Sequence, residues 1–212
     1  MGIFKQFFNN TRKPDGWMGK LMVNGMNQGH AAVSDWGLSY FPDVPGAAHS
    51  MLADFGCGGG RNTAELLKRF PEARVTALDY SKVACDKTKQ FNRNEVQAGR
   101  CNVVQGDVSR LPFEAATFDV ITAFETVYFW PGPVESFQEV WRVLKPGGTF
   151  MIVNESDGRN TKDEKWAGII DGMRIFTQER LTQYLKDAGF SQIAAHVNRK
   201  QHWICLLAEK AR

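Results

Sequence analysis

Short apolar runs alternate with amphipathic segments along the chain from residue 51 onward. The apolar or β-branched runs have the length of strands and occupy residues 51–55, 74–79, 101–105, 118–124 and 149–153. Helical spacing of apolar side chains marks residues 62–70, 81–91 and 134–144. Ser81 stands where a helix cap is expected, and the sequence KPGG (145–148) ends the last of these helices. This alternation is typical of a parallel sheet with helices on both faces.

The pattern changes near the C-terminus. A helix is predicted over residues 177–188, closed by Gly189, and strand candidates follow at residues 192–197 and 202–208. Only residues 198–201 separate these two strands, which is too short for a helical crossover, so we expect them to pair antiparallel. The sequence therefore predicts an α/β fold with a Rossmann-like, doubly wound, seven-stranded sheet. The sheet is mostly parallel and carries an antiparallel hairpin at its C-terminal edge.

Two segments fall outside this alternation. Residues 1–50 precede the first strand and are rich in glycine, asparagine, tryptophan and methionine, whereas residues 154–176 are polar and contain glycine. Both would lie near the carboxyl ends of the strands, where a doubly wound sheet binds its ligand. We therefore expect residues 1–50 to form a helical cover and residues 51–212 to form one domain, within which residues 154–176 form a lid.

Composition narrows the classes of protein. The 212 residues are 43% hydrophobic and 23% charged, as in an ordinary globular protein, and no apolar run reaches the ~18 residues of a membrane span. A net charge of +3 is small for a nucleic-acid binder. Because the cysteines form no CxxC pair, we expect no metal site, and reduced thiols in a cytoplasmic protein. They are Cys57, Cys85, Cys101 and Cys205.

The glycine-rich sequence DFGCGGG (54–60) joins the first predicted strand to the first predicted helix. Its glycines would let a ligand approach the N–H groups at the start of that helix. Arg61 and Asn62 follow where a phosphate-binding P-loop would have lysine and then serine or threonine. A dinucleotide fingerprint requires glycines two and five positions after the first, and the residue five positions after Gly56 is Arg61. Both nucleotide classes are therefore disfavoured.

Acidic residues stand at the ends of the first three predicted strands. Asp54, just before the glycine loop, would suit a ligand with a positively charged amino group rather than a phosphate. Asp79 ends the second strand 21 residues after Gly58, the position from which a carboxylate binds ribose hydroxyls. Asp107 follows the third strand, where it could accept a hydrogen bond from an adenine amino group. An amino acid, a ribose and an adenine in one ligand describe S-adenosylmethionine, although each acid could instead cap or end its local element.

Five motifs occur in one order over roughly residues 50–155, about half of the chain. They are DFGCGGG (54–60), ALDYS (77–81), GDVSRLPF (106–113), FDVITAFETV (118–127) and EVWRVLKPGGTFMIV (139–153). Together they resemble the class I S-adenosylmethionine-dependent methyltransferases, close to the small-molecule type that includes enzymes of ubiquinone and menaquinone biosynthesis. The predicted antiparallel edge hairpin also fits the fold of that family.

The resemblance implies S-adenosylmethionine as the cofactor and S-adenosylhomocysteine as the product. The residues that it implies at the cofactor are Asp54, Phe55, Gly56, Gly58, Gly60, Asp79, Tyr80, Asp107, Val108 and Phe124. Within this set the glycine loop would surround the methionine moiety, Asp79 would bind the ribose, and Asp107 and Val108 would lie at the adenine. Phe124 and Glu125 would line the floor beneath the sulfonium.

Methyl transfer from a sulfonium requires the nucleophile, the methyl carbon and the sulfur to be held in line. A base is needed only where the proton of the acceptor leaves reluctantly. His30, in the unusual segment 23–30, and Glu125 and Tyr128, after the fourth strand, are the candidate catalytic residues. Glu155, after the fifth strand, could also face the acceptor. The alternatives are a surface or helix-capping histidine and, for Tyr128, Phe129 and Trp130, simple packing beneath the lid.

The expected acceptor is a small apolar or aromatic molecule, because aromatic residues are abundant in the expected cover and lid. These are Phe4, Phe7, Phe8, Trp17, Trp36, Tyr40, Phe41 and Trp166. The fourth strand ends in AFET (123–126) and so lacks the NPPY-type tetrapeptide of amino-methylating nucleic-acid enzymes. A methyltransferase of a small molecule is therefore the main hypothesis. A quinone-type carbon methyltransferase, an RNA methyltransferase and a non-catalytic S-adenosylmethionine-binding protein are the alternatives, and the oligomeric state is left open.

Overall fold

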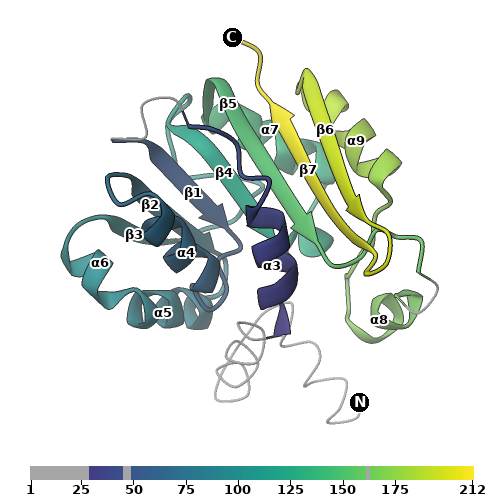
Figure 1. Ribbon diagram of the computed structural model, residues 1–212, viewed down its shortest axis with the longest axis horizontal. Coiled ribbons are helices and arrows are strands. Elements are labelled where there is room, and N and C mark those ends of the chain that lie inside the picture. The colour runs from purple at the N-terminus through teal and green to yellow at the C-terminus, as the bar shows by residue number, and fades with distance from the viewer. Residues whose placement is uncertain (1–28, 45–48, 161–162) are drawn as a thin grey trace.

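The computed structural model describes residues 29–44, 49–160 and 163–212, which form a seven-stranded sheet in the order β3-β2-β1-β4-β5-β7-β6 (Figure 1). The strands are β1 (Met51–Phe55), β2 (Arg74–Asp79), β3 (Cys101–Gln105), β4 (Phe118–Phe124), β5 (Leu144–Asn154), β6 (Gln192–Asn198) and β7 (Trp203–Glu209). Neighbouring strands from β1 to β5 pair in parallel, whereas β7 pairs antiparallel with both β5 and β6. The predicted mostly parallel sheet with an antiparallel edge hairpin is confirmed.

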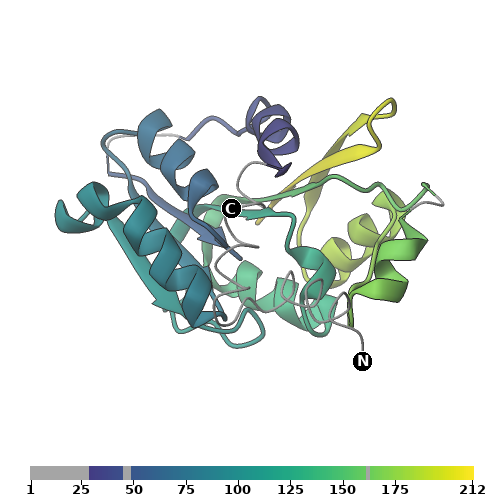
Figure 2. The ribbon, with the colours of Figure 1, turned by 90° about the horizontal axis from the view of Figure 1, so that it is seen from below.

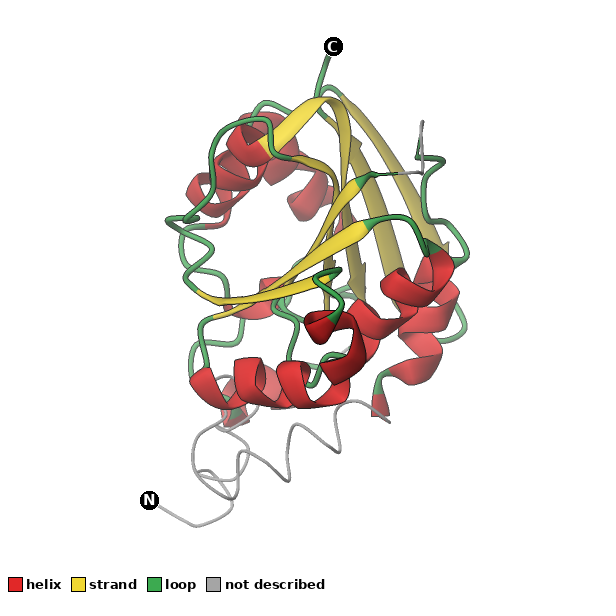
Figure 3. Ribbon diagram, turned by 90° about the vertical axis from the view of Figure 1, so that its left-hand side faces the viewer, coloured by secondary structure: helices red, strands yellow, loops and turns green. Residues whose placement is uncertain are grey.

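Helices cover both faces of this sheet (Figure 2 and Figure 3). They are α3 (Ala31–Leu38), α4 (Arg61–Arg69), α5 (Lys82–Phe91), α6 (Arg93–Gln97), the 3-10 helix η1 (Val127–Phe129), α7 (Pro133–Val143), α8 (Glu164–Ile169) and α9 (Gln178–Asp187). Apolar side chains of α3 and α4 pack on one face, and those of α7 and α9 pack on the other. Among these helices, none has the length and apolar character needed to cross a membrane.

The two apolar layers fix the helices against the sheet. On one face, Leu66 and Leu67 of α4 are at most 2% exposed and join a cluster with Val75 of β2. On the other face, Phe137 of α7 and Phe150 of β5 are at most 1% exposed, with their ring centroids 5.5 Å apart. Burial of each such side chain stabilises the fold by about 1.5–3 kcal/mol. The loops at the carboxyl ends of the strands are thereby held on a rigid support.

Helix starts follow the capping residues in the sequence. The Ser81 hydroxyl accepts the N–H of Ala84 at 3.3 Å and begins α5, as predicted. The Thr177 hydroxyl accepts the N–H of Arg180, also at 3.3 Å, and begins α9. Each cap satisfies one backbone donor that the first turn leaves without an intrahelical partner.

The fifth strand begins earlier than predicted. Residues 145–148 were expected as a turn that separates a helix from a strand at residue 149, but β5 already starts at Leu144. Leu144 pairs with Phe118, and the register between β4 and β5 then shifts before Val120. Pro146, Gly147 and Gly148 therefore lie within β5, where its pairing with β4 is irregular. The short helix α6 was not predicted, because it buries no side chain and so has no apolar periodicity.

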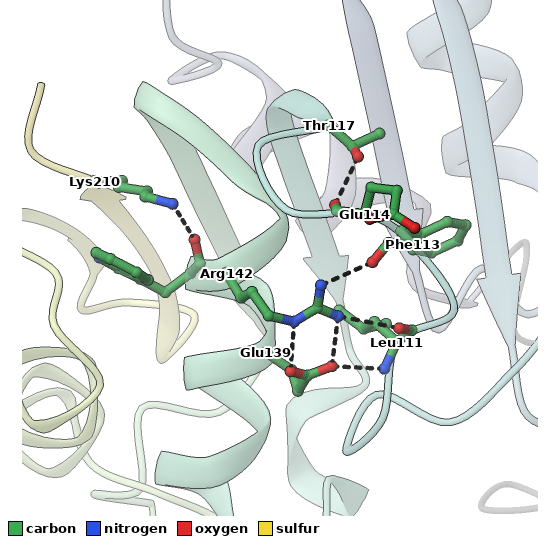
Figure 4. A network of polar contacts seen from close by, with 8 residues as sticks. Leu111, Phe113, Glu114, Thr117, Glu139, Arg142 and Lys210 are labelled. Atoms are coloured by element: carbon green, nitrogen blue, oxygen red, sulfur yellow. Dashed lines mark hydrogen bonds and ion pairs between the residues drawn. The ribbon is translucent and has the colours of Figure 1, made fainter.

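Arg142 of α7 fixes the long segment between β3 and β4 (Figure 4). Its guanidinium donates to the carbonyls of Phe113 at 2.8 Å and Leu111 at 3.1 Å, and it pairs with Glu139 at 2.7 Å. Glu139 in turn accepts the N–H of Leu111 at 2.9 Å. This network ties the segment 107–117 to α7, so the residues directly after β3 have a defined position at the edge of the sheet.

The expected N-terminal cover is only partly within the described residues. Residues 1–28 lie outside them, whereas α3 packs against β5 and β7. A Cβ on Gly37 of α3 would lie 2.5 Å from Val153, so glycine permits this close approach. The segment 154–176 carries α8. The domain boundary at residue 50 and the lid role of segment 154–176 stay predictions.

Candidate active site

The glycine-rich loop leaves β1 and enters α4 at the carboxyl edge of the sheet. The N–H groups of Gly56 and Cys57 donate to the carbonyl of Leu78, at 2.7 and 3.1 Å. Gly56 has a φ of +77°, and a Cβ at this position would lie 2.1 Å from Oγ1 of Thr126. Glycine is therefore required where the loop passes the segment that follows β4.

Asp79 ends β2 with its carboxylate against this loop. Its Oδ2 accepts the N–H of Gly58 at 3.0 Å, and its Oδ1 accepts the N–H of Ser81 at 2.9 Å. The residue is 7% exposed, and burial raises the pKa of its carboxyl to about 6, although the N–H groups oppose this shift. Asp79 is therefore mostly ionised at pH 7 and is held in one position by the backbone.

A cavity of about 480 Å³ lies beside Asp79, within the range of small-molecule binding sites. Its lining residues are Gly56, Gly58, Leu78, Asp79, Tyr80, Gly106, Asp107, Val108, Phe124, Glu125, Thr126, Phe129, Trp130, Pro131, Gly172 and Arg174. Seven of the ten residues expected at the cofactor thus meet in one cavity at the carboxyl ends of β1 to β4. This is the edge at which a doubly wound sheet binds ligands.

The other three of these residues, Asp54, Phe55 and Gly60, are not in the lining of this cavity. Asp54 is 1% exposed, and its carboxylate accepts hydrogen bonds from the hydroxyls of Thr63 at 2.7 Å and Thr122 at 3.2 Å. Burial raises the pKa of Asp54 to about 6. Phe55 is fully buried in the core, and Gly60 starts α4 in the left-handed conformation. Direct contact of these three residues with a cofactor stays a prediction.

A second, smaller cavity beside the glycine loop is lined by His30 and Glu125 among others. Nδ1 of His30 lies 3.2 Å from Oε2 of Glu155 and 3.7 Å from Oε2 of Glu125. His30 immediately precedes α3, and its carbonyl accepts the N–H of Ser34 at 3.0 Å. Burial lowers the pKa of His30. The hydrogen bond to Glu155 and the charges of Glu125 and Glu155 together raise it by more than burial lowers it, so the pKa lies above its usual value.

Glu125 follows β4 in the left-handed conformation, with a φ of +56°. Such a backbone is uncommon outside glycine and is often found at functional sites. Its N–H donates to the carbonyl of Val153 at 2.9 Å, and its Oε1 accepts the N–H of Glu155. The side chain is 8% exposed. Burial raises the pKa of Glu125 to about 8, the charge of Glu155 adds to the shift and His30 opposes it, so the carboxyl is largely protonated at pH 7.

Tyr128 lies behind this group in η1. It is 2% exposed, and its hydroxyl oxygen accepts the N–H of Ser156 at 3.2 Å. Burial raises the pKa of the phenol well above its usual value. Tyr128 is not in the lining of the large cavity, but its hydroxyl also forms a hydrogen bond with Glu125 that opposes the raised pKa of that carboxyl. Its predicted catalytic role stays a prediction.

The group of His30, Glu125 and Glu155 offers two kinds of chemistry. An imidazole whose Nδ1 faces carboxylates is the arrangement of a general base held in one tautomer. The same three side chains place one ligand atom each within 4.8 Å of one another, a nitrogen and oxygen donor set that could hold a divalent cation. The expectation of no metal site did not consider this convergence, because the three residues are far apart in the sequence.

Part of the cavity lining was not singled out from the sequence. Gly172 and Arg174 come from the segment 154–176, which was assigned only as a lid, and Phe129 and Trp130 were equally explained by packing. Arg174 reaches the site through a long-range contact, because its guanidinium donates to the carbonyl of Trp130 at 2.5 Å. No local motif marks such a contact.

Comparison with known proteins agrees with the geometry. The family model described as a methyltransferase domain matches residues 53–152. Cycloartenol-C-24-methyltransferase 1 of Oryza sativa subsp. japonica is 34% identical over 153 residues, which are 67% of this chain and 44% of that protein. Malonyl-[acyl-carrier protein] O-methyltransferase of Herminiimonas arsenicoxydans is 29% identical over 160 residues, which are 74% of this chain and 58% of that protein.

A solved structure extends the likeness over the whole chain. A chain of the Haloferax volcanii complex that contains the Trm112 methyltransferase activator superposes with a TM-score of 0.80 at 17% identity. The match covers 100% of this chain and 99% of that chain, and it shows the fold. The present chain spans about half the length of the curated relatives that it matches.

Proposed function

Because the chain belongs to the class I S-adenosylmethionine-dependent methyltransferases, we propose that it transfers a methyl group from S-adenosylmethionine to a small-molecule acceptor. The observation that carries this proposal is the convergence of Asp79, Asp107 and the glycine loop on one cavity of about 480 Å³. Each belongs to a different βα segment, and each was expected at the same ligand. When bound, S-adenosylmethionine supplies an electrophilic methyl group on a sulfonium.

The residues of the strand ends fit this cofactor. Both carboxylate oxygens of Asp79 accept backbone N–H groups, and a carboxylate has about four acceptor sites, so capacity for further hydrogen bonds remains, as a ribose diol requires. Gly56 and Gly58 lack side chains where the methionine moiety would approach the loop. Asp107, whose Oδ1 accepts the N–H of Ser109 at 2.8 Å, and Val108 would hold the adenine.

The group after β4 and β5 would face the acceptor. His30 would take the proton of an acceptor hydroxyl or amine at Nε2, because its Nδ1 is directed to Glu155. The raised pKa makes the imidazole a stronger base. General-base catalysis of this kind contributes about 10²- to 10⁴-fold in rate. Glu125 would be chiefly protonated at pH 7 and would line the site beside His30, where that proton is transferred.

The acceptor would be small and at least partly apolar or aromatic, since Phe129, Trp130 and Pro131 form one wall of the cavity. The names of the two relatives above point to a sterol-type acceptor and to a carrier-bound malonyl group, which differ too much to name one acceptor. A cytoplasmic location remains our inference from the four cysteine thiols, all of which are free and buried. A quinone-type acceptor is the narrower alternative.

Calorimetric titration with S-adenosylmethionine, with NADH as the control ligand, tests the cofactor. We expect micromolar binding of the first and no binding of the second. Release of S-adenosylhomocysteine with at least one member of an acceptor panel would then separate an enzyme from a protein that only binds the cofactor. Absence of S-adenosylmethionine binding would contradict the proposed function.

A further inference from the structure

Arg174 is the one basic residue among the described residues that line the large cavity. The other charged groups of the lining are the carboxyls of Asp79, Asp107 and Glu125. The two aspartates lie at the ends of β2 and β3. Arg174 instead belongs to the loop between α8 and α9, so the positive charge enters the cavity from a different part of the chain.

The guanidinium of Arg174 is held in place by the wall that follows β4. The N–H of Arg174 donates to the carbonyl of Tyr128 at 2.9 Å, and its Nη2 donates to the carbonyl of Trp130 at 2.5 Å. Its Cζ lies 5.7 Å from the ring centroid of Phe176, which is 8% exposed. One carbonyl thus fixes the backbone of Arg174, and a second carbonyl and an aromatic ring position its side chain, although the residue as a whole is exposed.

This cation has unused hydrogen-bonding capacity. A guanidinium carries five N–H donors in a rigid fork, and the bond to Trp130 uses one of them. No carboxylate of the described part of the chain lies within ion-pair distance of Arg174, although six other lysine and arginine side chains of that part do form such pairs. A fixed, unpaired guanidinium that lines a cavity is suited to bind an oxyanion in a bidentate manner.

The carboxylate of the cofactor itself has a nearer candidate. Arg61 lines the smaller cavity together with the glycine loop, where the methionine moiety is expected. Its guanidinium also forms an ion pair with Asp35, with Nη2 at 2.5 Å from Oδ1. Arg174 instead lines the large cavity and is hydrogen-bonded to Trp130, one of the residues proposed to contact the acceptor. The cation of Arg174 is therefore available to the acceptor.

We propose that the methyl acceptor carries an oxyanion, a carboxylate or a phosphate monoester, and that Arg174 binds it while the apolar body of the acceptor packs on Phe129, Trp130 and Pro131. This inference rests on the proposed methyltransferase function and names the substrate class of the same site. Arg174 is then a specificity-determining residue, since an acceptor without the oxyanion would leave the guanidinium unpaired.

The test uses the full chain saturated with S-adenosylhomocysteine and three probes of similar size. These are phenylacetate, phenyl phosphate and the neutral phenylacetamide, each titrated by calorimetry. We expect at least one anion to bind tenfold or more tightly than the amide. Arg174→Gln should abolish this preference, and Arg174→Lys should retain part of it, because lysine keeps the charge without the fork. The anion that binds more tightly shows whether the oxyanion of the acceptor is a carboxylate or a phosphate.

Arg180→Gln is the matched control. Arg180 also lies over an aromatic ring, that of Tyr184 at 4.9 Å, but it is outside the cavity lining, so this variant should keep the preference for the anion. Equal affinity of the amide and both anions in the unmodified protein would overturn the proposal, and so would an unchanged preference in Arg174→Gln.

Binding of S-adenosylhomocysteine, measured first, separates this proposal from the proposed function. All three variants should bind it as the unmodified protein does. If Arg174→Gln loses that affinity while its thermal unfolding is unchanged, Arg174 serves the cofactor, and the acceptor proposal fails while the methyltransferase function stands. If the unmodified protein does not bind S-adenosylhomocysteine, the proposed function itself fails.

Discussion

The candidate site has two parts, a proposed cofactor end and a proposed acceptor end, which are built in different ways. At the cofactor end, Asp79 closes a regular strand and accepts two backbone N–H groups from the segments directly beside it. At the acceptor end, Glu125 has a left-handed backbone and meets His30 and Glu155, which lie 95 and 30 residues away in the sequence. Contacts within and between neighbouring βα segments thus build the first end, whereas contacts across 30 and 95 residues assemble the second.

The two carboxyls differ in charge as a result. Burial raises the pKa of both, but the N–H groups around Asp79 limit its value to about 6, whereas a neighbouring carboxylate helps to raise that of Glu125 to about 8. At pH 7 Asp79 is mostly ionised and Glu125 is mostly protonated. One end therefore presents a fixed negative charge to hydroxyl donors, and the other presents groups that exchange protons. This contrast matches binding at one end and chemistry at the other.

The largest expected effect concerns the acceptor end. His30→Ala should lower turnover by about 10²- to 10⁴-fold if His30 is the base, with the affinity for S-adenosylhomocysteine within twofold of the unmodified protein. Steady-state kinetics with the first acceptor that turns over, together with calorimetry, measures both. His196→Ala is the control and should leave turnover unchanged, because His196 stacks at 3.9 Å on Tyr40, which follows the C-terminal end of α3, whereas His30 precedes its N-terminal end. Equal losses of turnover and affinity in His30→Ala would make His30 a cofactor contact.

The next effect concerns the cofactor end. Gly56→Ala should cost about 2–5 kcal/mol of stability, because a left-handed backbone with a Cβ costs about 1–2 kcal/mol and the collision with Thr126 adds about 1–3 kcal/mol. Gly99→Ala is the matched control, since Gly99 has a φ of +72° and a Cβ there would meet nothing within 4 Å. Urea denaturation of both variants gives the difference. Similar losses in the two would show that the loop does not need to pass Thr126 closely.

The pH dependence of stability compares the ends directly. A carboxyl whose pKa is raised on folding binds its proton more tightly in the folded state, so stability falls as pH rises toward the folded pKa. For Asp79 this loss is nearly complete just above pH 6, whereas for Glu125 it continues to about pH 8. The raised pKa of His30 acts in the same direction.

Glu125→Gln should therefore flatten the fall in unfolding free energy between about pH 6 and pH 8, because the amide cannot ionise. Urea denaturation at a series of pH values measures the slope. Glu72→Gln, at an exposed glutamate, is the control and should keep the slope of the unmodified protein. An unchanged slope in Glu125→Gln would show that the raised pKa does not belong to Glu125.

The smallest expected effect is that of a chelator. Glu155 already holds the group together without a metal, because its carboxylate contacts Nδ1 of His30 and its backbone N–H donates to Glu125, so turnover should be the same with and without EDTA. Loss of activity in EDTA that Mn²⁺ restores would assign the group at the acceptor end to metal binding rather than to base catalysis.

The same contrast explains what the sequence could and could not predict. The glycine loop, Asp79 and the mostly parallel sheet with its antiparallel edge hairpin follow from residues that are close together in the sequence or repeat with a fixed period, and the observed sheet confirms this arrangement of strands. The early start of β5 at Leu144 was missed, because pairing with Phe118 is invisible to periodicity. Arg174 was missed because its position depends on carbonyls more than 40 residues away.

Asp54 shows a further limit. An acid before a glycine loop suggested a ligand contact, but two threonine hydroxyls from α4 and β4 surround its carboxylate. The sequence contains both threonines, yet neither is adjacent to Asp54 in the chain. The sequence therefore indicates which strand ends meet at one cavity better than it indicates the direction of each side chain, and contact of Asp54 with a cofactor stays a prediction.

The most direct measurement is the affinity for S-adenosylhomocysteine of Asp79→Ala and of Glu125→Gln, each compared with the unmodified protein by calorimetry. Asp79→Ala should lose about 1–3 kcal/mol of binding free energy, because the ribose hydroxyls lose a charged acceptor. Asp79→Asn, which keeps one oxygen acceptor, should lose less. Glu125→Gln should bind within twofold of the unmodified protein. Unchanged affinity in Asp79→Ala, or an equal loss in Glu125→Gln, would contradict the division of the cavity into a cofactor end and an acceptor end.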